Sequence, residues 1–171
     1  MISAFILSQI LIGIAFLFDL ASFQFKERKA TLLCFAAAAA LIAAHFFVLG
    51  AITAGAVIAV SAVRFLVSIF STDARLMYVF LLITLGLGAY TFSEYTDLII
   101  TAAILISTYA AFQKNEKRLR QFMMITTSLA ITYNIIIFSP AAIALEVFFL
   151  GSNLFSYWRF YLRKNQDSIT S

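Results

Sequence analysis

The chain has 171 residues, of which 63% are hydrophobic and 12% are charged, and its mean hydropathy is +1.00. Soluble domains average about 45–50% apolar and about 25% charged residues, so a water-soluble fold of this composition would expose large apolar patches. The formal net charge of +4 does not indicate a nucleic-acid partner, because the basic residues gather between apolar segments. The composition therefore predicts an integral membrane protein that does not bind nucleic acid.

Apolar segments divide the chain into seven predicted transmembrane helices, since about 20 residues span the hydrocarbon core of a bilayer. The first segment has no basic residue before it and is longer than a signal-peptide core of about 7–15 residues, so we expect it to be retained. Gly50 and the Ser139-Pro140 pair are predicted to form tight turns. The segments cover residues 2–23, 30–49, 51–70, 76–92, 98–112, 122–138 and 141–162.

Basic residues occur in every second connection between these segments, whereas the other connections contain no Lys or Arg. Cytoplasmic loops of membrane proteins carry the excess of Lys and Arg. The pattern therefore predicts a multi-pass protein with a periplasmic N-terminus and a cytoplasmic C-terminus. The residues of the basic connections are Lys26, Arg28, Lys29, Arg75, Lys114, Lys117, Arg118, Arg120, Arg163 and Lys164.

An internal repeat is indicated by residues 21–29, which align without a gap to residues 110–118 with four identities. Residues 61–65 also match residues 156–160 after a small insertion. We expect an all-α membrane bundle in which two parallel three-helix repeats are joined by a linker helix, a 3+1+3 arrangement. The alternative is that polar helix ends converge on similar residues. The predicted parts of this single membrane domain, residues 1–171, are repeat one at 2–70, the linker helix at 76–92, repeat two at 95–163 and a short cytoplasmic tail at 164–171.

Two stretches resemble a known family of membrane proteins. Residues 45–50 (His-Phe-Phe-Val-Leu-Gly), followed by residues 54–56 and Arg64, resemble the YgjV family of bacterial inner membrane proteins, and so does the region 153–159. The resemblance covers about residues 10–163. It implies a location in the bacterial cell inner membrane, but no activity is established for that family, so it implies no function.

A more distant resemblance concerns the ends of the first and fifth segments. Phe23-Gln24 and Phe112-Gln113, each followed by a basic connection, are similar to the Pro-Gln pair of PQ-loop and SWEET-type carriers. Phenylalanine replaces proline at both places, so the helix-kinking residue of that motif is missing. This resemblance implies a transporter built from two three-helix repeats.

Ionisable residues inside the predicted helices are functional candidates, because a charge within hydrocarbon is costly. Asp19 and Arg64 are predicted at similar depth near the cytoplasmic side, where they would form an ion pair that gates a solute path or anchors a substrate. Structural neutralisation of a snorkelling Arg64 is the alternative. Glu146 with His45 would act on the outer side, coupling transport to protons, although a hydrogen-bonded His45 at a helix end is the simpler interpretation.

Uncharged polar side chains provide predicted contacts for a small polar solute, and we select Asn153, Ser61 and Ser156. The alternative for each is a hydrogen bond between packed helices. One cysteine, one histidine and eight acidic residues offer no catalytic arrangement and no metal-ligand spacing. We therefore expect no enzyme, no catalytic residue, no metal site and no cofactor.

Two functions are consistent with these patterns. The first is a small-polar-solute carrier in which two three-helix bundles enclose a mid-membrane site and expose it alternately. The second is a non-transporting membrane subunit or assembly factor that binds partner helices through small-residue surfaces. The expected partners are the lipid bilayer and a small polar solute. The patterns are also consistent with a homo-oligomer.

Overall fold

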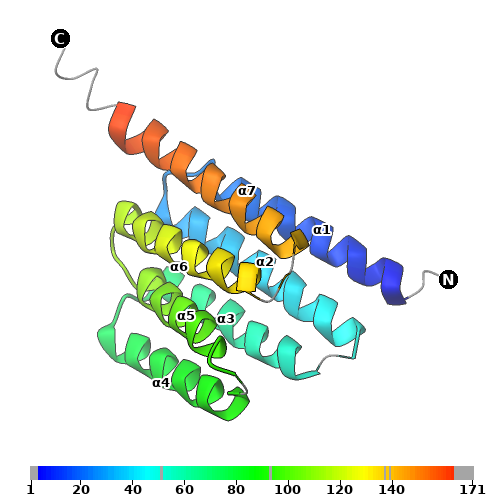
Figure 1. Ribbon diagram of the computed structural model, residues 1–171. Coiled ribbons are helices and arrows are strands. Elements are labelled where there is room, and N and C mark those ends of the chain that lie inside the picture. Colours follow the sequence, from blue (N-terminus) through cyan, green and yellow to red (C-terminus); the bar gives the residue numbers. More distant parts are fainter. Residues whose placement is uncertain (1–3, 51, 93, 137, 139, 164–171) are drawn as a thin grey trace, which may run out of the picture. The chain divides into compact units, whose positions relative to one another are not determined.

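The computed structural model describes residues 4–50, 52–92, 94–136, 138 and 140–163. These residues form seven α-helices and one π-helical segment, so the predicted all-α class is confirmed (Figure 1). The elements are α1 (Ala4–Ser22), α2 (Arg28–Val48), α3 (Ile52–Phe70), α4 (Ala74–Thr91), α5 (Asp97–Ala111), α6 (Glu116–Ile136), α7 (Pro140–Tyr157) and η1 (Trp158–Leu162).

Several of these helices have the length and composition of membrane spans. Among the described residues, α1, α2 and α4 are long and apolar enough to cross a bilayer, and the stretches Gly55–Phe70 and Asp97–Ala111 are shorter apolar helices. Large apolar side chains on α1 are exposed, including Phe5 and Leu17. Such side chains are stable in contact with lipid and costly in water.

The chain divides into two compact units, residues 1–71 (unit 1) and residues 72–171 (unit 2). Unit 1 contains α1 to α3, and unit 2 contains α4 to α7 with η1. The predicted repeats at 2–70 and 95–163 and the linker role of residues 76–92 stay predictions. The predicted tail, residues 164–171, lies outside the described residues.

In unit 1, α2 packs against both α1 and α3. Alanine, the best helix former, fills positions 36–40 of α2, and its small side chain lets neighbouring helices approach closely. Ala38 and Ala39 are buried, as are Ala15 on α1 and Ala62 on α3. Larger side chains complete this core, with the ring of Phe35 lying 5.5 Å from that of Phe65.

The turn predicted at Gly50 is present between α2 and α3. Gly50 has a φ of +77°, in the left-handed region that glycine adopts without steric cost. A second glycine, Gly55, permits close packing in the same unit, since an added Cβ would lie 2.6 Å from atoms of the Phe47 ring. Gly50 thus forms the turn, and Gly55, within α3, lets that helix pack closely against Phe47 of α2.

Unit 2 is a series of neighbouring helices in which α4 packs on α5, α5 on α6 and α6 on α7. Gly88 of α4 faces Thr101 of α5 so closely that an added Cβ would lie 2.8 Å from its Cγ2 atom. An edge-to-face contact of 4.9 Å between Tyr109 and Phe122 joins α5 to α6. These contacts are the small-residue and aromatic packing expected between membrane helices.

The start of α6 corrects a boundary predicted from the sequence. The sequence predicts the sixth segment at 122–138, whereas α6 begins at Glu116. The Asn115 side chain explains the early start, because its Oδ1 atom accepts a hydrogen bond of 2.8 Å from the Lys117 backbone N–H and so caps the helix. Arg120, assigned to a loop by the sequence pattern, therefore lies inside a helix.

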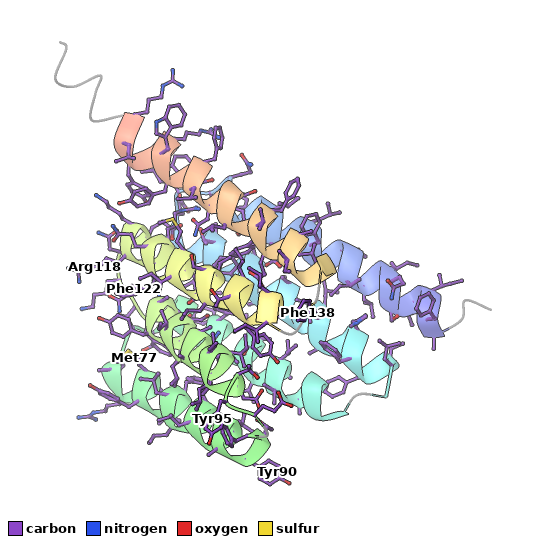
Figure 2. The ribbon with its side chains drawn as sticks, viewed as in Figure 1. Met77, Tyr90, Tyr95, Arg118, Phe122 and Phe138 are labelled. Atoms are coloured by element: carbon purple, nitrogen blue, oxygen red, sulfur yellow. The ribbon has the colours of Figure 1, made fainter. Side chains whose placement is uncertain are left out.

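The two ends of unit 2 differ in charge. Arg118 lies at the start of α6, whereas Tyr90 and Tyr95 lie at the opposite end of the unit, around the connection from α4 to α5 (Figure 2). That connection is followed by Asp97 at the first position of α5. Four basic residues lie where α5 ends and α6 begins, namely Lys114, Lys117, Arg118 and Arg120.

Candidate functional site

A buried polar cluster lies where the first two turns of α6 meet the end of α7 and η1. We call it the Arg120 cluster, and its members are Glu116, Arg120, Asn153 and Tyr161. Arg120 is 2% exposed, Glu116 is 7% exposed and Asn153 is 1% exposed. Charged side chains are almost never buried to this extent unless they are paired.

Helical spacing brings Glu116 and Arg120 together, because residues i and i+4 share one helix face. The Arg120 Nε atom lies 2.8 Å from Glu116 Oε1 in an ion pair. Tyr161 on η1 interacts electrostatically with both Arg120 and Glu116. The Phe160 ring covers the same group, with its centroid 5.7 Å from Cζ of Arg120.

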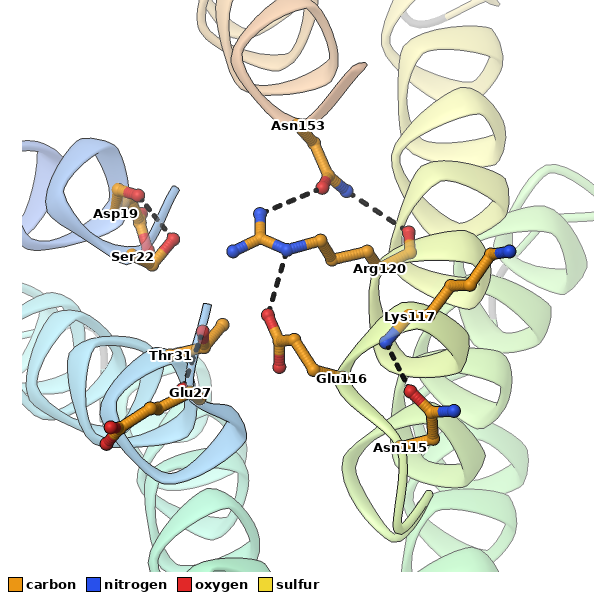
Figure 3. A network of polar contacts seen from close by, with 9 residues as sticks. All are labelled: Asp19, Ser22, Glu27, Thr31, Asn115, Glu116, Lys117, Arg120 and Asn153. Carbon is orange, nitrogen blue, oxygen red and sulfur yellow. Dashed lines mark hydrogen bonds and ion pairs between the residues drawn. The ribbon is translucent and has the colours of Figure 1, made fainter. Parts of the chain in front are cut away.

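Asn153 connects α7 to α6 through both ends of its amide. Its Nδ2 atom donates a hydrogen bond of 3.2 Å to the Arg120 backbone carbonyl. Its Oδ1 atom accepts a longer one, 3.4 Å, from Arg120 Nη1. Figure 3 shows the Asn153 and Glu116 side chains both directed at Arg120. Asn153 is therefore hydrogen-bonded to both the backbone and the side chain of Arg120.

The cluster is a closely paired arrangement of one cation, one anion and neutral donors and acceptors. A buried pair of this kind adds little stability by itself, because desolvation offsets the mutual attraction of the charges, but it is costly to break. It can hold two helices in one register. It can also change state when a competing anion or proton reaches either partner.

The predicted site residues of unit 2 have different surroundings. Asn153 and Ser156 are buried, Ser156 being 3% exposed. Glu146, also on α7, is half-buried, and among the described residues its carboxylate forms no hydrogen bond or ion pair. The structure brings Asn153 to Arg120, which the sequence did not predict as its partner.

The predicted residues of unit 1 lie on all three of its helices. Arg64 on α3 is 3% exposed, and its guanidinium lies 4.6 Å from the centroid of the Phe65 ring. Ser61 on α3 and Asp19 on α1 are half-buried. The ion pair between Asp19 and Arg64 and the solute contact of Ser61 stay predictions.

His45 has a hydrogen-bond partner in the neighbouring helix. Its Nδ1 atom lies 2.9 Å from the Ser8 carbonyl oxygen, which can only accept, so Nδ1 carries the proton. This contact joins α2 to α1 near the end of α2. The pairing of His45 with Glu146 stays a prediction.

The sequence reasoning missed Glu116 and Arg120, although two signals were present. The two residues have the i, i+4 spacing of a helical ion pair, and Glu116 is identical to Glu27 in the repeat alignment. The charge-rich stretch 114–120 has the composition of a single connection, so its hydropathy predicts a loop at both residues. The structure shows that this helix begins within the stretch.

Comparisons with known proteins place the chain in a family. The family model described as "Bacterial inner membrane protein" (Imp-YgjV) matches residues 6–164, nearly the whole chain. The chain belongs to the Imp-YgjV family. It is 28% identical over 156 residues to "Inner membrane protein YgjV" of Escherichia coli (strain K12), a match covering 90% of this chain and 82% of that protein. No solved structure matches the chain significantly.

Family membership confirms the resemblance predicted from residues 45–64 and 153–159. With the apolar helices of both units, it establishes a multi-pass protein of the bacterial inner membrane. The buried ion pair of the Arg120 cluster is accordingly that of a membrane protein, in which ionisable residues among the helices are functional candidates by default.

Proposed function

We propose that the protein is a carrier of a small polar solute that works by alternating access, with no enzymatic step. The observation that carries the proposal is the Arg120 cluster, in which Arg120, Glu116 and Asn153 are buried together in a helical unit of a membrane protein. Ionisable residues in such units pair with one another and mark solute and ion pathways in many transporters.

The arrangement of helices within each unit supports this mechanism. In unit 1 the middle helix α2 contacts both α1 and α3, and in unit 2 α6 contacts both α5 and α7. The two sets of three helices therefore have the same order of neighbours. That similarity favours two parallel repeats joined by α4, the organisation of carriers whose halves move against one another.

Asn153, Ser156 and Ser61 are the proposed solute contacts. Asn153 and Ser156 are on one face of α7, three residues apart and both buried. Amides and hydroxyls can bind a solute by hydrogen bonds without adding charge to the site. In this proposal the solute competes for the Asn153 amide with Arg120.

Four ionisable residues are the proposed gates. Asp19 and Arg64 close the cytoplasmic side, with the N-terminus of the chain in the periplasm. Glu146 and His45 act on the outer side and couple transport to protons. Glu146 supports this assignment because its carboxylate has no ion pair among the described residues, so it is available to take up a proton.

A thermal-shift screen of the purified, detergent-solubilised protein tests the proposal. The probes are sugars, amino acids, nucleosides and cations, each with the wild-type protein, Asn153→Ala and the control Asn134→Ala. Asn134 is a half-buried amide of α6, so the control removes the same chemical group outside the cluster. A ligand at about 100 times its Kd adds about 2.7 kcal/mol to the stability of the native state.

The expected result is one solute class that stabilises the wild-type protein and Asn134→Ala but not Asn153→Ala. The comparison uses the ligand-induced shift within each variant, so the intrinsic cost of removing Asn153 cancels. Uptake of that solute into proteoliposomes then has to fall in Asp19→Asn or Glu146→Gln. A flat screen in the wild-type protein would refute the carrier and favour the partner-binding subunit.

A further inference from the structure

The charged end of unit 2 carries more basic side chains than its carboxylates neutralise. At this end Glu116 is paired with Arg120, and Asp73 caps α4 by accepting a hydrogen bond from the Arg75 backbone N–H. Among the described residues, five further cations at this end form no ion pair with a carboxylate. They are Lys114, Lys117, Arg118, Arg159 and Arg163.

Lys117 is held in place by two tyrosine rings. Its Nζ atom lies 5.9 Å from the ring centroids of both Tyr157 and Tyr161, in cation–π contacts that join α6 to α7 and η1. The two rings lie 5.3 Å apart and tilted by 45°. The two rings therefore hold the Lys117 ammonium group beside them and restrict its motion.

Gln121, one helical turn after Lys117, completes this group of donors. Its Nε2 atom donates a hydrogen bond of 2.9 Å to the Tyr157 hydroxyl oxygen. Because that oxygen is the acceptor, the hydrogen of the Tyr157 hydroxyl remains available to donate. Lys117, Gln121 and Tyr157 thus present an ammonium, an amide N–H and a hydroxyl together, a donor set suited to a phosphate oxygen.

The surroundings of this donor set are those of the membrane interface. Trp158 follows Tyr157 directly and is exposed, as are the apolar side chains of Phe155 and Leu162 on the same segment. Tyrosine and tryptophan concentrate at the level of lipid headgroups, and basic clusters beside membrane helices bind anionic lipids. Soluble anions would gain nothing from the adjacent exposed apolar side chains.

We propose that Lys117, Gln121 and Tyr157 bind the phosphodiester headgroup of an anionic phospholipid at the charged end of unit 2. Lys114 and Arg118 add attraction for its negative charge, and the exposed side chains of α7 and η1 contact its acyl chains. The inference rests on the membrane location of the protein and is independent of the carrier proposal.

Native mass spectrometry of the full, detergent-purified chain tests the proposal. Phosphatidylglycerol and phosphatidylcholine with identical acyl chains are titrated into the wild-type protein, Lys117→Gln, Tyr157→Phe and the control Arg75→Gln. Arg75 is an exposed cation at the same end of the unit, on α4, so the control removes the same charge away from the tyrosines. Trp158 emission checks that each variant is folded.

We expect the wild-type protein to retain phosphatidylglycerol in preference to phosphatidylcholine. Lys117→Gln should weaken phosphatidylglycerol binding about fivefold, the effect of one interfacial cation. Tyr157→Phe, which keeps every charge, should weaken it roughly two- to tenfold, the effect of one hydrogen bond. Arg75→Gln should leave the preference in place.

Three outcomes would overturn the inference. Equal retention of the two lipids by the wild-type protein would show that the headgroup charge is not recognised. An equal loss in Arg75→Gln and Lys117→Gln would mean that diffuse charge attracts the lipid, not a defined site. Displacement of phosphatidylglycerol by inorganic phosphate at equal concentration would identify the ligand as a soluble anion.

Discussion

Replacing Glu116 by glutamine tests whether the Arg120 cluster is a coupled ion pair. The substitution keeps the shape of the side chain and one carbonyl oxygen, but it removes the charge that lies 2.8 Å from Arg120 Nε. Arg120, which is 2% exposed, would then keep its positive charge with no carboxylate beside it in α6. The cost arises from the desolvated cation, not from lost packing.

The magnitude follows from burial. Removing one partner of a buried pair costs about 3–5 kcal/mol, whereas an exposed pair contributes about 0–1 kcal/mol. We expect a loss of about 3 kcal/mol in Glu116→Gln, at the low end because the glutamine oxygen still accepts a hydrogen bond. Unfolding by titration with sodium dodecyl sulfate measures it, followed by the emission of Trp158, the single tryptophan of the chain.

The double variant Glu116→Gln/Arg120→Met separates charge from shape. Methionine fills much of the arginine volume without a charge, so the double variant should recover about 2 kcal/mol of the loss. Glu94→Gln, the same change at an exposed carboxylate of unit 2, should cost less than about 0.5 kcal/mol. Equal losses in Glu116→Gln and Glu94→Gln would refute the coupled pair.

Three further substitutions test the packing of the two units, each by the same unfolding titration. His45→Phe removes the donor to the Ser8 carbonyl and should lower the free energy of unfolding by about 1 kcal/mol. An unchanged free energy of unfolding would contradict this hydrogen bond. Gly88→Ala should destabilise α4 against α5 by about 1–3 kcal/mol, and Thr101→Ala in the same chain should restore stability by removing the overlapping atoms. Gly50→Ala places a Cβ at a φ of +77° and should cost about 1–2 kcal/mol, whereas a neutral result would mean that the turn relaxes.

Much of the fold could be predicted because it depends on composition and local breaks. Apolar stretches of suitable length predict the helices, and Gly50, a break in a stretch too long for one span, predicts the turn that its positive φ confirms. The start of α6 could not be placed by hydropathy, since its first turns are charged. There the deciding signal was a capping asparagine, Asn115, whose effect is a single hydrogen bond.

The candidate site was only partly accessible from the sequence. The position of Asn153 as a polar residue in the seventh segment predicts a functional role, and Asn153 is buried as part of a polar cluster. Its partner Arg120 lies on another helix, and that proximity depends on how α6 and α7 pack. A basic residue beside an apolar segment gives the same sequence pattern whether its side chain faces the lipid headgroups or the neighbouring helices. Only the helix rotation distinguishes the two cases.

The two buried arginines, Arg64 and Arg120, do not occupy matching positions in the predicted repeats. The alignment that pairs Glu27 with Glu116 also pairs Thr31 with Arg120, and the Thr31 hydroxyl donates a hydrogen bond of 3.2 Å to the Glu27 backbone carbonyl. The buried arginine of unit 1 is Arg64 on α3, whose aligned counterpart Arg159 is exposed. Among the described residues, each unit therefore buries one guanidinium, but at a different repeat position. If the halves are repeats, their charged sites have diverged, so a mechanism that uses aligned residues symmetrically does not fit this chain.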